Sequence, residues 1–182
     1  MNGYAIEPGA DLRDADLRDA DLRGASLPES DLRDADLRCA DLALADLTKA
    51  DLRDADLNNA DLRESVLSDA DLTNANLSKA ELLHAELLDA DLTNAKLFNA
   101  NLFMSNLADA NLADADLRHA NFAKANLTGA NLSNADLTNA DMRKANLFNA
   151  DLTGAKMLGL VWDADTIWPK EFDPPPSDGE VK

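Results

Sequence analysis

Residues 10–24 read ADLRDADLRDADLRG, and the same five-residue unit, Ala-Asp/Asn-Leu-X-X, continues in one register to residue 159. We number each unit around its central residue i, so that the first centre is Leu12 and the last is Met157. The centre is Leu in 27 of the 30 units, and position i−2 is Ala in 27 of them. This strict period indicates that every unit places the same two apolar residues in the interior.

A period of five fits neither an α-helix nor a flat strand. At 3.6 residues per turn, successive centres would be displaced by about 140° around a helix, which spreads the apolar residues over every face. In a flat strand, an odd period would send each successive centre to the opposite face. The chain must therefore turn once in every unit, as a short extended segment followed by a corner.

Positions i+2 and i−1 agree with such a corner. Position i+2 is Asp, Asn or Gly in 19 of the 30 units, and these residue types tolerate positive φ. Position i−1 is Asp or Asn in 24 units, and such side chains accept hydrogen bonds from nearby backbone N–H groups. We therefore expect the acidic column at i−1 to have a structural role.

The tandem Ala-Asp/Asn-Leu-X-X array resembles the pentapeptide repeat family over 150 of the 182 residues. The resemblance implies an all-β fold, a right-handed quadrilateral β-helix in which four repeats form one square coil. The 30 repeats would then give about 7.5 coils, stacked at the β spacing of ~4.8 Å. Each coil is expected to contact only its neighbours, as in other solenoids.

Four segments follow from this assignment: an N-terminal cap at residues 1–9, the β-helix at 10–159, a C-terminal cap at 160–173 and a disordered tail at 174–182. Tyr4 and Ile6 are expected to cover the N-terminal end. The C-terminal cap is predicted from four bulky residues, Trp162, Ile167, Trp168 and Phe172. Some members of the family pair through their C-terminal ends. The alternative is therefore that these four residues form a homodimer interface.

The predicted core consists of the centres, represented by Leu12, Leu77, Phe122 and Met142. Phe122 and Met142 lie one coil apart in one column, where a larger and a flexible residue can compensate in volume.

A second apolar group occupies positions that should face outward: Leu83, Leu88, Phe98, Phe103 and Met104. Leu83 and Phe103 are expected to stack on one face and Phe98 to lie on the next. An exposed apolar cluster on a rod is a candidate contact surface for a protein partner. The alternative is a set of tolerated surface residues that stack along a column.

The formal net charge of −18 disfavours direct binding to nucleic acid or to a membrane surface. With twenty residues per coil, the acidic ladder at i−1 comprises Asp11, Asp31, Asp51, Asp71 and Asp91. Arginines at i+1 are expected to offset its self-repulsion. The acidic surface suits a basic partner or simply keeps a long array in solution.

Enzymatic chemistry is not expected, and no catalytic, cofactor or metal residues are predicted. His84 and His119 fall on different faces, and Cys39 has no His in the same coil to activate it. Phosphate loops, zinc motifs and the Gly-rich nonapeptide of calcium-binding β-rolls do not occur. One cysteine, and the lack of a long apolar run or a basic-then-apolar N-terminus, predict a cytoplasmic protein.

The sequence therefore predicts a non-enzymatic structural or protein-interaction module, a rigid acidic rod that presents a binding face. A spacer without a specific partner is the simpler alternative. The resemblance adds a second function, because some pentapeptide repeat proteins mimic DNA and bind a type II topoisomerase such as DNA gyrase. Those members tend to have Phe-rich centres and irregular repeats, whereas this array is Leu-centred and has no inserted loop.

Overall fold

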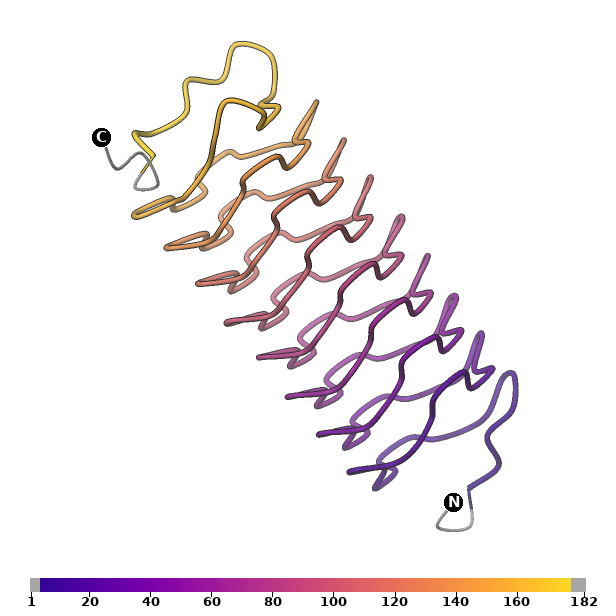
Figure 1. Ribbon diagram of the computed structural model, residues 1–182. Coiled ribbons are helices and arrows are strands. Elements are labelled where there is room, and N and C mark those ends of the chain that lie inside the picture. The colour runs from indigo at the N-terminus through magenta and orange to yellow at the C-terminus, as the bar shows by residue number, and fades with distance from the viewer. Residues whose placement is uncertain (1–3, 178–182) are drawn as a thin grey trace.

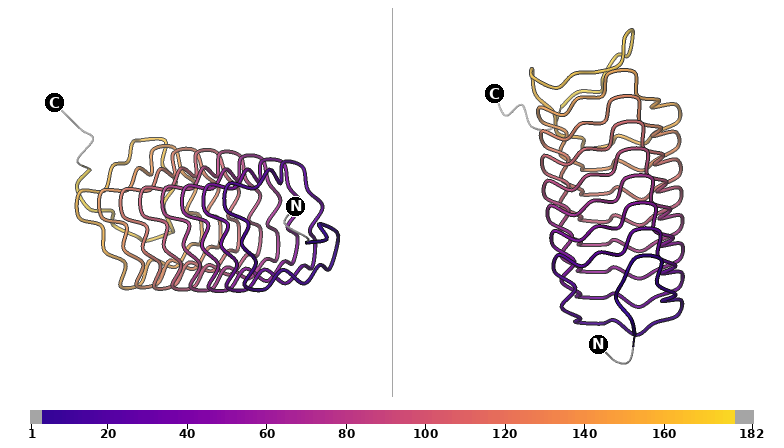
Figure 2. Two further views of the ribbon diagram at one scale, coloured as in Figure 1. Left: turned by 90° about the horizontal axis from the view of Figure 1, so that it is seen from below. Right: turned by 90° about the vertical axis from the view of Figure 1, so that its right-hand side faces the viewer.

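The computed structural model describes residues 4–177, which wind as a stack of similar coils along one axis (Figure 1). The two ends of the chain lie at opposite ends of the stack, and the outline of the coil is nearly constant along it (Figure 2). Adjacent coils are joined by single-residue parallel β-bridges, the first between Asp11 and Asp31 and the last between Asn146 and Ile167. None of the described residues forms a helix that could cross a membrane.

The bridges fix the number of repeats in a coil. From Asp11 to Val161, every bridge joins residues twenty positions apart, so one coil contains four repeats. We name the four sides by their first centres: side A starts at Leu12, side B at Leu17, side C at Leu22 and side D at Leu27. Each side consists of a face, positions i−2 to i, and the corner that follows it, positions i+1 and i+2.

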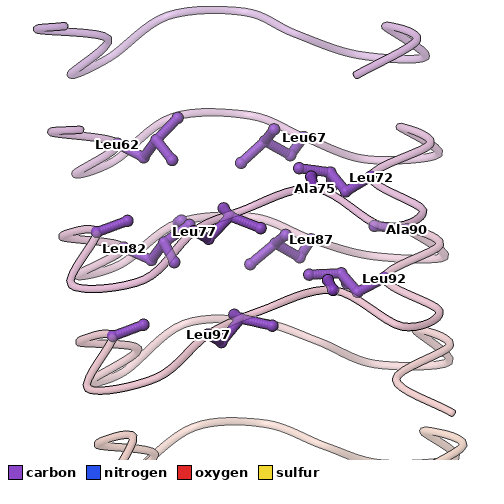
Figure 3. Close-up of a cluster of buried hydrophobic side chains, with 14 of the residues drawn as sticks. Leu62, Leu67, Leu72, Ala75, Leu77, Leu82, Leu87, Ala90, Leu92 and Leu97 are labelled. Atoms are coloured by element: carbon purple, nitrogen blue, oxygen red, sulfur yellow. The ribbon is translucent and has the colours of Figure 1, made fainter. Parts of the chain in front are cut away.

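The interior is filled by the centres and by the small residue at i−2. Leu77, Phe122 and Met142 are completely buried and Leu12 nearly so. Centres of one side stack directly on one another, as Leu62 on Leu82 and Leu77 on Leu97 do in Figure 3. Because complete burial of such a side chain contributes about 1.5–3 kcal/mol, the stacked centres are the main apolar contribution to stability.

The corners are β-turns with a left-handed third residue. The N–H of each following i−2 residue donates to the carbonyl of the centre, for example Ala15 N to Leu12 O at 3.1 Å. Every corner has a positive φ at i+2, for example 55° at Asp14 and 58° at Met104. This explains the preference for Asp, Asn and Gly at i+2, which reach the left-handed region at low cost.

Backbone atoms satisfy four of the five N–H groups in a repeat. In the repeat centred on Leu32, position i−2 donates within the turn, i−1 donates to the preceding coil, and i and i+2 donate to the next coil. The bonds are Ser30 N to Leu27 O at 3.3 Å, Asp31 N to Ala10 O at 2.9 Å, Leu32 N to Asp51 O at 2.7 Å and Asp34 N to Arg53 O at 3.1 Å. The N–H of position i+1 has no backbone acceptor among the described residues and needs another acceptor.

The side chain at i−1 supplies that acceptor. In all 24 repeats with Asp or Asn at i−1, its Oδ1 accepts the N–H of i+1 at 2.9–3.4 Å. Of the six other repeats, one has Pro28 at i+1, which carries no N–H. The other five amides have no acceptor within residues 4–177: Ser68, Leu83, Leu88, Phe98 and Leu158.

Residues 4–9, the described part of the N-terminal segment, pack on the first coil. Tyr4 and Ile6 pack against the core. The chain then joins the first coil through hydrogen bonds from Gly9 N to Pro28 O at 2.9 Å and from Ala10 N to Glu7 O at 3.1 Å.

The C-terminal end differs from the predicted boundaries. The repeat register continues beyond residue 159, because Leu160 is buried at an i−2 position and Val161 bridges to Asp141. One extra residue then shifts the last bridge, so that Thr166 is buried and Ile167 is 51% exposed. The Thr166 hydroxyl donates to Met142 O at 3.0 Å. The inward residue of this segment is therefore Thr166 rather than Ile167.

Residues 174–177 also depart from the expected disorder. The indole Nε1 of Trp162 donates to Pro175 O at 2.9 Å, and Ser177 Oγ donates to Trp162 O at 2.8 Å. These bonds hold the proline segment against the cap, so the cap extends to residue 177. Residues 178–182, the rest of the predicted tail, lie outside the described residues.

We expect the i−1 acceptor to be measurable in urea unfolding. Asp41→Ala removes the acceptor of Ala43 N, which lies 3.0 Å away, and should lower the free energy of unfolding by about 1 kcal/mol. Asp41→Asn keeps an acceptor and should have little effect. Lys96→Asn gives the Phe98 amide an acceptor and should stabilise the protein, whereas Lys96→Gln, whose amide is one carbon further out, should not. Equal stability of Asp41→Ala and Asp41→Asn would contradict this role.

Candidate functional site

Charge is divided unevenly among the four sides. Within the repeats, side A has ten acidic and three basic residues, and side D has six acidic and one basic. Side B has six of each, and side C has six acidic and five basic residues. Because sides D and A adjoin, the rod has a strongly acidic half and a nearly neutral half.

The predicted acidic ladder lies on side A and is largely paired with arginines. Arg13 contacts Asp11 at 2.6 Å and Asp31, one coil further, at 3.5 Å. Arg33 and Arg53 repeat this arrangement, and the last contact joins Arg53 to Asp71 at 3.4 Å. The ladder is therefore a chain of alternating charges rather than an open acidic column.

In the C-terminal half of side A, amide side chains rather than arginines link i−1 residues of successive coils. Asp91 accepts a hydrogen bond from the Thr93 hydroxyl at 2.6 Å and from Asn111 Nδ2 at 3.3 Å. Asn131 Nδ2 in turn donates to Asn111 Oδ1 at 2.9 Å. The coils are thus linked by ion pairs near the N-terminus and by neutral amide bonds further along.

Apart from Asp19 on side B and Glu64 on side C, the uncompensated corner acids of the repeats stand on sides A and D. They occupy position i+2, where the side chain points outward, and make no ion pair with any described residue: Asp14, Asp34, Asp54 and Asp114 on side A, and Glu29, Asp69, Asp89 and Asp109 on side D. Sequence reasoning placed the acidic surface on the i−1 ladder instead. The i+2 columns were visible in the sequence, but which ladder acids are paired depends on arginine rotamers.

The five outward apolar residues do not form one patch. Leu83, Phe103 and Met104 lie at the corner of side C, Leu88 lies at the corner of side D and Phe98 at that of side B. Leu83 and Phe103 stack in one column, since Glu64 N donates to Leu83 O at 2.9 Å and His84 N to Phe103 O at 3.1 Å.

Cations cover two of the aromatic rings. The Arg118 guanidinium lies 5.6 Å from the centroid of the Phe98 ring, and the His119 ring packs edge-on at 5.4 Å. Lys124 Nζ lies 5.2 Å from the Phe103 centroid. Phe98 on side B and Phe103 on side C are therefore both partly covered, and the exposed members of the predicted cluster are Met104 on side C and Leu88 on side D.

The corner of side C also holds an apolar residue that sequence reasoning missed. Leu44 is 48% exposed and lies in the i+2 column of Met104. Two hollows open on this corner, one of about 110 Å³ lined by Ala43 and Leu44 and one of about 210 Å³ lined by Ala123 and Phe103. Reading the sequence at intervals of twenty would have placed Leu44 beside the others. Phe148 and Leu158, also exposed, were missed as well.

The aromatic residues of the C-terminal cap pack on one another. The Trp162 and Trp168 rings meet edge-on with centroids 5.8 Å apart, and Trp168 stacks on Phe172 at 5.4 Å. All three are half-buried against the last coils. Among the buried side-chain nitrogen and oxygen atoms of residues 4–177, Trp168 Nε1 is the one that makes no hydrogen bond.

The titratable residues considered for chemistry remain apart. Cys39 is exposed on side B, and His84 and His119 lie at the corners of sides C and B. Among residues 4–177, no three His, Cys, Asp or Glu side chains are grouped so that they could hold a metal ion.

The Asp–Arg pairs predict a specific acid response. The hydrogen bond from the Arg13 side chain lowers the pKa of Asp11 from 3.8 to about 2, and Arg18 does the same for Asp16. The pKa of each carboxyl is lower in the folded than in the unfolded protein. The ion pair therefore stabilises the fold fully at a pH above the unfolded-state pKa, and this stabilisation is lost as the pH falls through the folded-state pKa. We therefore expect stability to fall between about pH 4 and pH 2. Carboxyl NMR titration should show Asp11 titrating near 2, and Arg13→Gln should return its pKa towards 3.8; an unchanged Asp11 pKa in that variant would contradict the pairing.

The sequence model of the family described as pentapeptide repeats matches the chain at residues 8–34, 29–63, 65–102 and 105–143. No curated protein sequence matches significantly. Among solved structures, the pentapeptide repeat protein Rfr23 from the cyanobacterium Cyanothece 51142 is 39% identical over 51% of this chain, with a TM-score of 0.51. The match spans 63% of the length of Rfr23. The pentapeptide repeat protein alr5209 from Nostoc Pcc 7120 is 38% identical over 51% of this chain and 77% of its own, with a TM-score of 0.50.

A more distant likeness covers nearly the whole chain. A trypsin-treated form of QnrB1, a plasmid-mediated fluoroquinolone resistance protein, is 18% identical over 87% of this chain and 92% of its own, with a TM-score of 0.52. At this identity the likeness shows the fold alone. That fold is the right-handed quadrilateral β-helix, and pentapeptide repeat proteins are generally non-enzymatic structural or interaction modules. The chain belongs to the pentapeptide repeat family.

Proposed function

We propose that the protein is a non-enzymatic interaction module, a rigid rod of 30 repeats in about 7.5 coils that presents the corner of side C to a protein partner. The observation that carries this proposal is the division of charge described above. Sides A and D repel other acidic surfaces, whereas side C is nearly neutral and combines exposed Leu44 and Met104 with half-buried Leu83 and Phe103. Such a mixture of apolar and charged groups is typical of protein contact surfaces.

The repeat architecture supports a scaffold role for this surface. All corners share one backbone conformation, so the side chains at i+1 and i+2 are held at fixed intervals of ~4.8 Å along the rod. A surface held in this way needs little ordering when a partner binds, which favours affinity. The described residues offer open hollows of modest volume on this side rather than an enclosed pocket.

A capture experiment tests the proposed face. Tagged protein carrying Leu83→Asp and Phe103→Asp should retain fewer proteins from a lysate than the unmodified rod. The matched control is Leu88→Asp with Ala108→Asp, which places two charges at the equivalent stacked positions of side D. If the side C variant and the control capture the same proteins as the unmodified rod, side C is not the binding face. Circular dichroism checks that both variants keep the β-helix.

The second candidate function is mimicry of DNA towards a type II topoisomerase such as DNA gyrase. It is favoured by the uncompensated acids at the corners of sides D and A, which form an acidic edge along the rod. The net charge of −12 on these two sides is spread over ~36 Å, or about one charge per 3 Å, whereas duplex DNA carries one per ~1.7 Å. The rod therefore reaches about half the charge density of DNA.

Gyrase supercoiling with titrated protein tests this second function. If the acidic edge binds the enzyme, inhibition should be lost in a variant with Asp14, Asp34 and Asp54 changed to Asn. The control changes Asp21, Asp41 and Asp61 to Asn, which removes the same charge from side C and keeps an acceptor at each i−1 position. If the supercoiling activity of gyrase is unchanged at a high excess of the protein, the protein does not act as a DNA mimic towards this enzyme.

A further inference from the structure

The i+1 column of side C alternates large and small residues around an apolar centre. In chain order it consists of Arg23, Ala43, Arg63, Leu83, Phe103, Ala123 and Arg143, and Asp163 follows at the next level. We propose that this corner is the interface of an antiparallel homodimer, with a two-fold axis between Leu83 and Phe103. The inference rests on the proposed function of side C as a binding face and identifies its occupant as a second copy of the chain.

Apolar side chains lie at the centre of this interface. A two-fold axis between adjacent coils places Leu83 of one copy against Phe103 of the other, and the same contact occurs twice. His84 and Met104 face each other beside it in the same way. Leu83 also contributes an amide N–H that has no acceptor within residues 4–177, so a partner that supplies an oxygen gains a hydrogen bond there.

The two hollows match the two arginines that would face them. Ala43 lies at the hollow of about 110 Å³, and the axis places Arg143 of the second copy over it. Ala123 lies at the hollow of about 210 Å³, which would receive Arg63 of the second copy. Large residues thus meet small ones at both levels, as a self-complementary two-fold interface requires.

Charges are complementary under the same axis. Glu64 would face Lys124 of the second copy, and Arg23 would face Asp163. None of these four residues makes an ion pair with a described residue, although the other corner arginines all do. The N-terminal half of side C has a net charge of −3 and the C-terminal half +2, so antiparallel pairing brings opposite charges together.

No other side combines these features. Sides A and D would bring like charges together in a second copy. Side B is balanced in charge, but its Lys79 would face Asn99 across the equivalent axis, and its outward apolar residues Phe98 and Leu158 lie three coils apart rather than in one cluster. Side C is therefore the side on which a second copy fits.

Sedimentation equilibrium of the full chain tests the dimer, with reductant present to keep Cys39 reduced. We expect a concentration-dependent dimer that weakens as salt is raised. Glu64→Lys places two lysines opposite each other twice in the interface and should weaken dimerisation at least about tenfold. Asp69→Lys, the same charge change at the same repeat position on side D, should leave it unchanged or slightly stronger. The double variant Glu64→Lys, Lys124→Glu restores opposite charges and should recover the dimer to within about threefold.

Several outcomes would overturn the inference. The first is a monomer at low salt and ~100 µM protein. The second is an equal loss of dimerisation affinity in Glu64→Lys and in Asp69→Lys. The third is a double variant that stays monomeric while its circular dichroism spectrum is unchanged. A dimer insensitive to Glu64→Lys but lost on Trp162→Ala would place the contact at the C-terminal cap instead. A monomer that still captures a lysate protein through Leu83 and Phe103 would leave the proposed function standing, whereas a monomer that captures none would remove both.

Discussion

The hydrogen bond from the i+1 amide to the i−1 side chain is the constraint on which this β-helix depends. A chain that turns every five residues satisfies four amides per repeat with carbonyl groups, and no carbonyl of the described residues accepts the fifth. Asp and Asn have an oxygen at the right distance from the backbone to accept it, and the longer Glu81 and Glu86 side chains instead accept bonds from Asn101 and Asn106 of the next coil. Much of the acidity of the chain therefore follows from the geometry of the corner.

This origin of the acidic residues changes how the charge is interpreted. Acids at i−1 are held by the corner and, in the N-terminal coils, by arginines such as Arg13 and Arg33. Acids at i+2, such as Asp14 and Asp34, are not needed as acceptors, although they suit the left-handed corner. The uncompensated charge at i+2, which is concentrated on sides D and A, is therefore the part of the acidity available to a partner. Since all sides share one backbone, what distinguishes them is the choice of residues at i+1 and i+2.

The sequence predicted the repeat unit, the inward positions and the turn at each corner, because all three follow from a strict apolar period and from residue types with narrow backbone preferences. The number of repeats per coil came from the family resemblance, and with it the assignment of residues to sides. Comparing residues at intervals of twenty places Leu44 in the column of Met104, so this neighbour was within reach of the sequence. Two other features were not. Arg118 and His119 cover Phe98 through their side-chain conformations. The one-residue shift that buries Thr166 in place of Ile167 follows from packing at the C-terminal end, where the period has stopped.

Residue-resolved amide hydrogen exchange tests the central claim most directly. If the i−1 side chain completes the backbone hydrogen bonding, the i+1 amides of Thr73 and Thr93, which have Asp acceptors at 3.0 and 2.9 Å, should be protected. The i+1 amides of Ser68, Leu83, Leu88 and Phe98, which are in the same coils or adjacent ones but follow Val, Glu or Lys at i−1, should exchange much faster. Equal protection of the two groups would mean that the acidic and amide residues at i−1 are not what completes the corner.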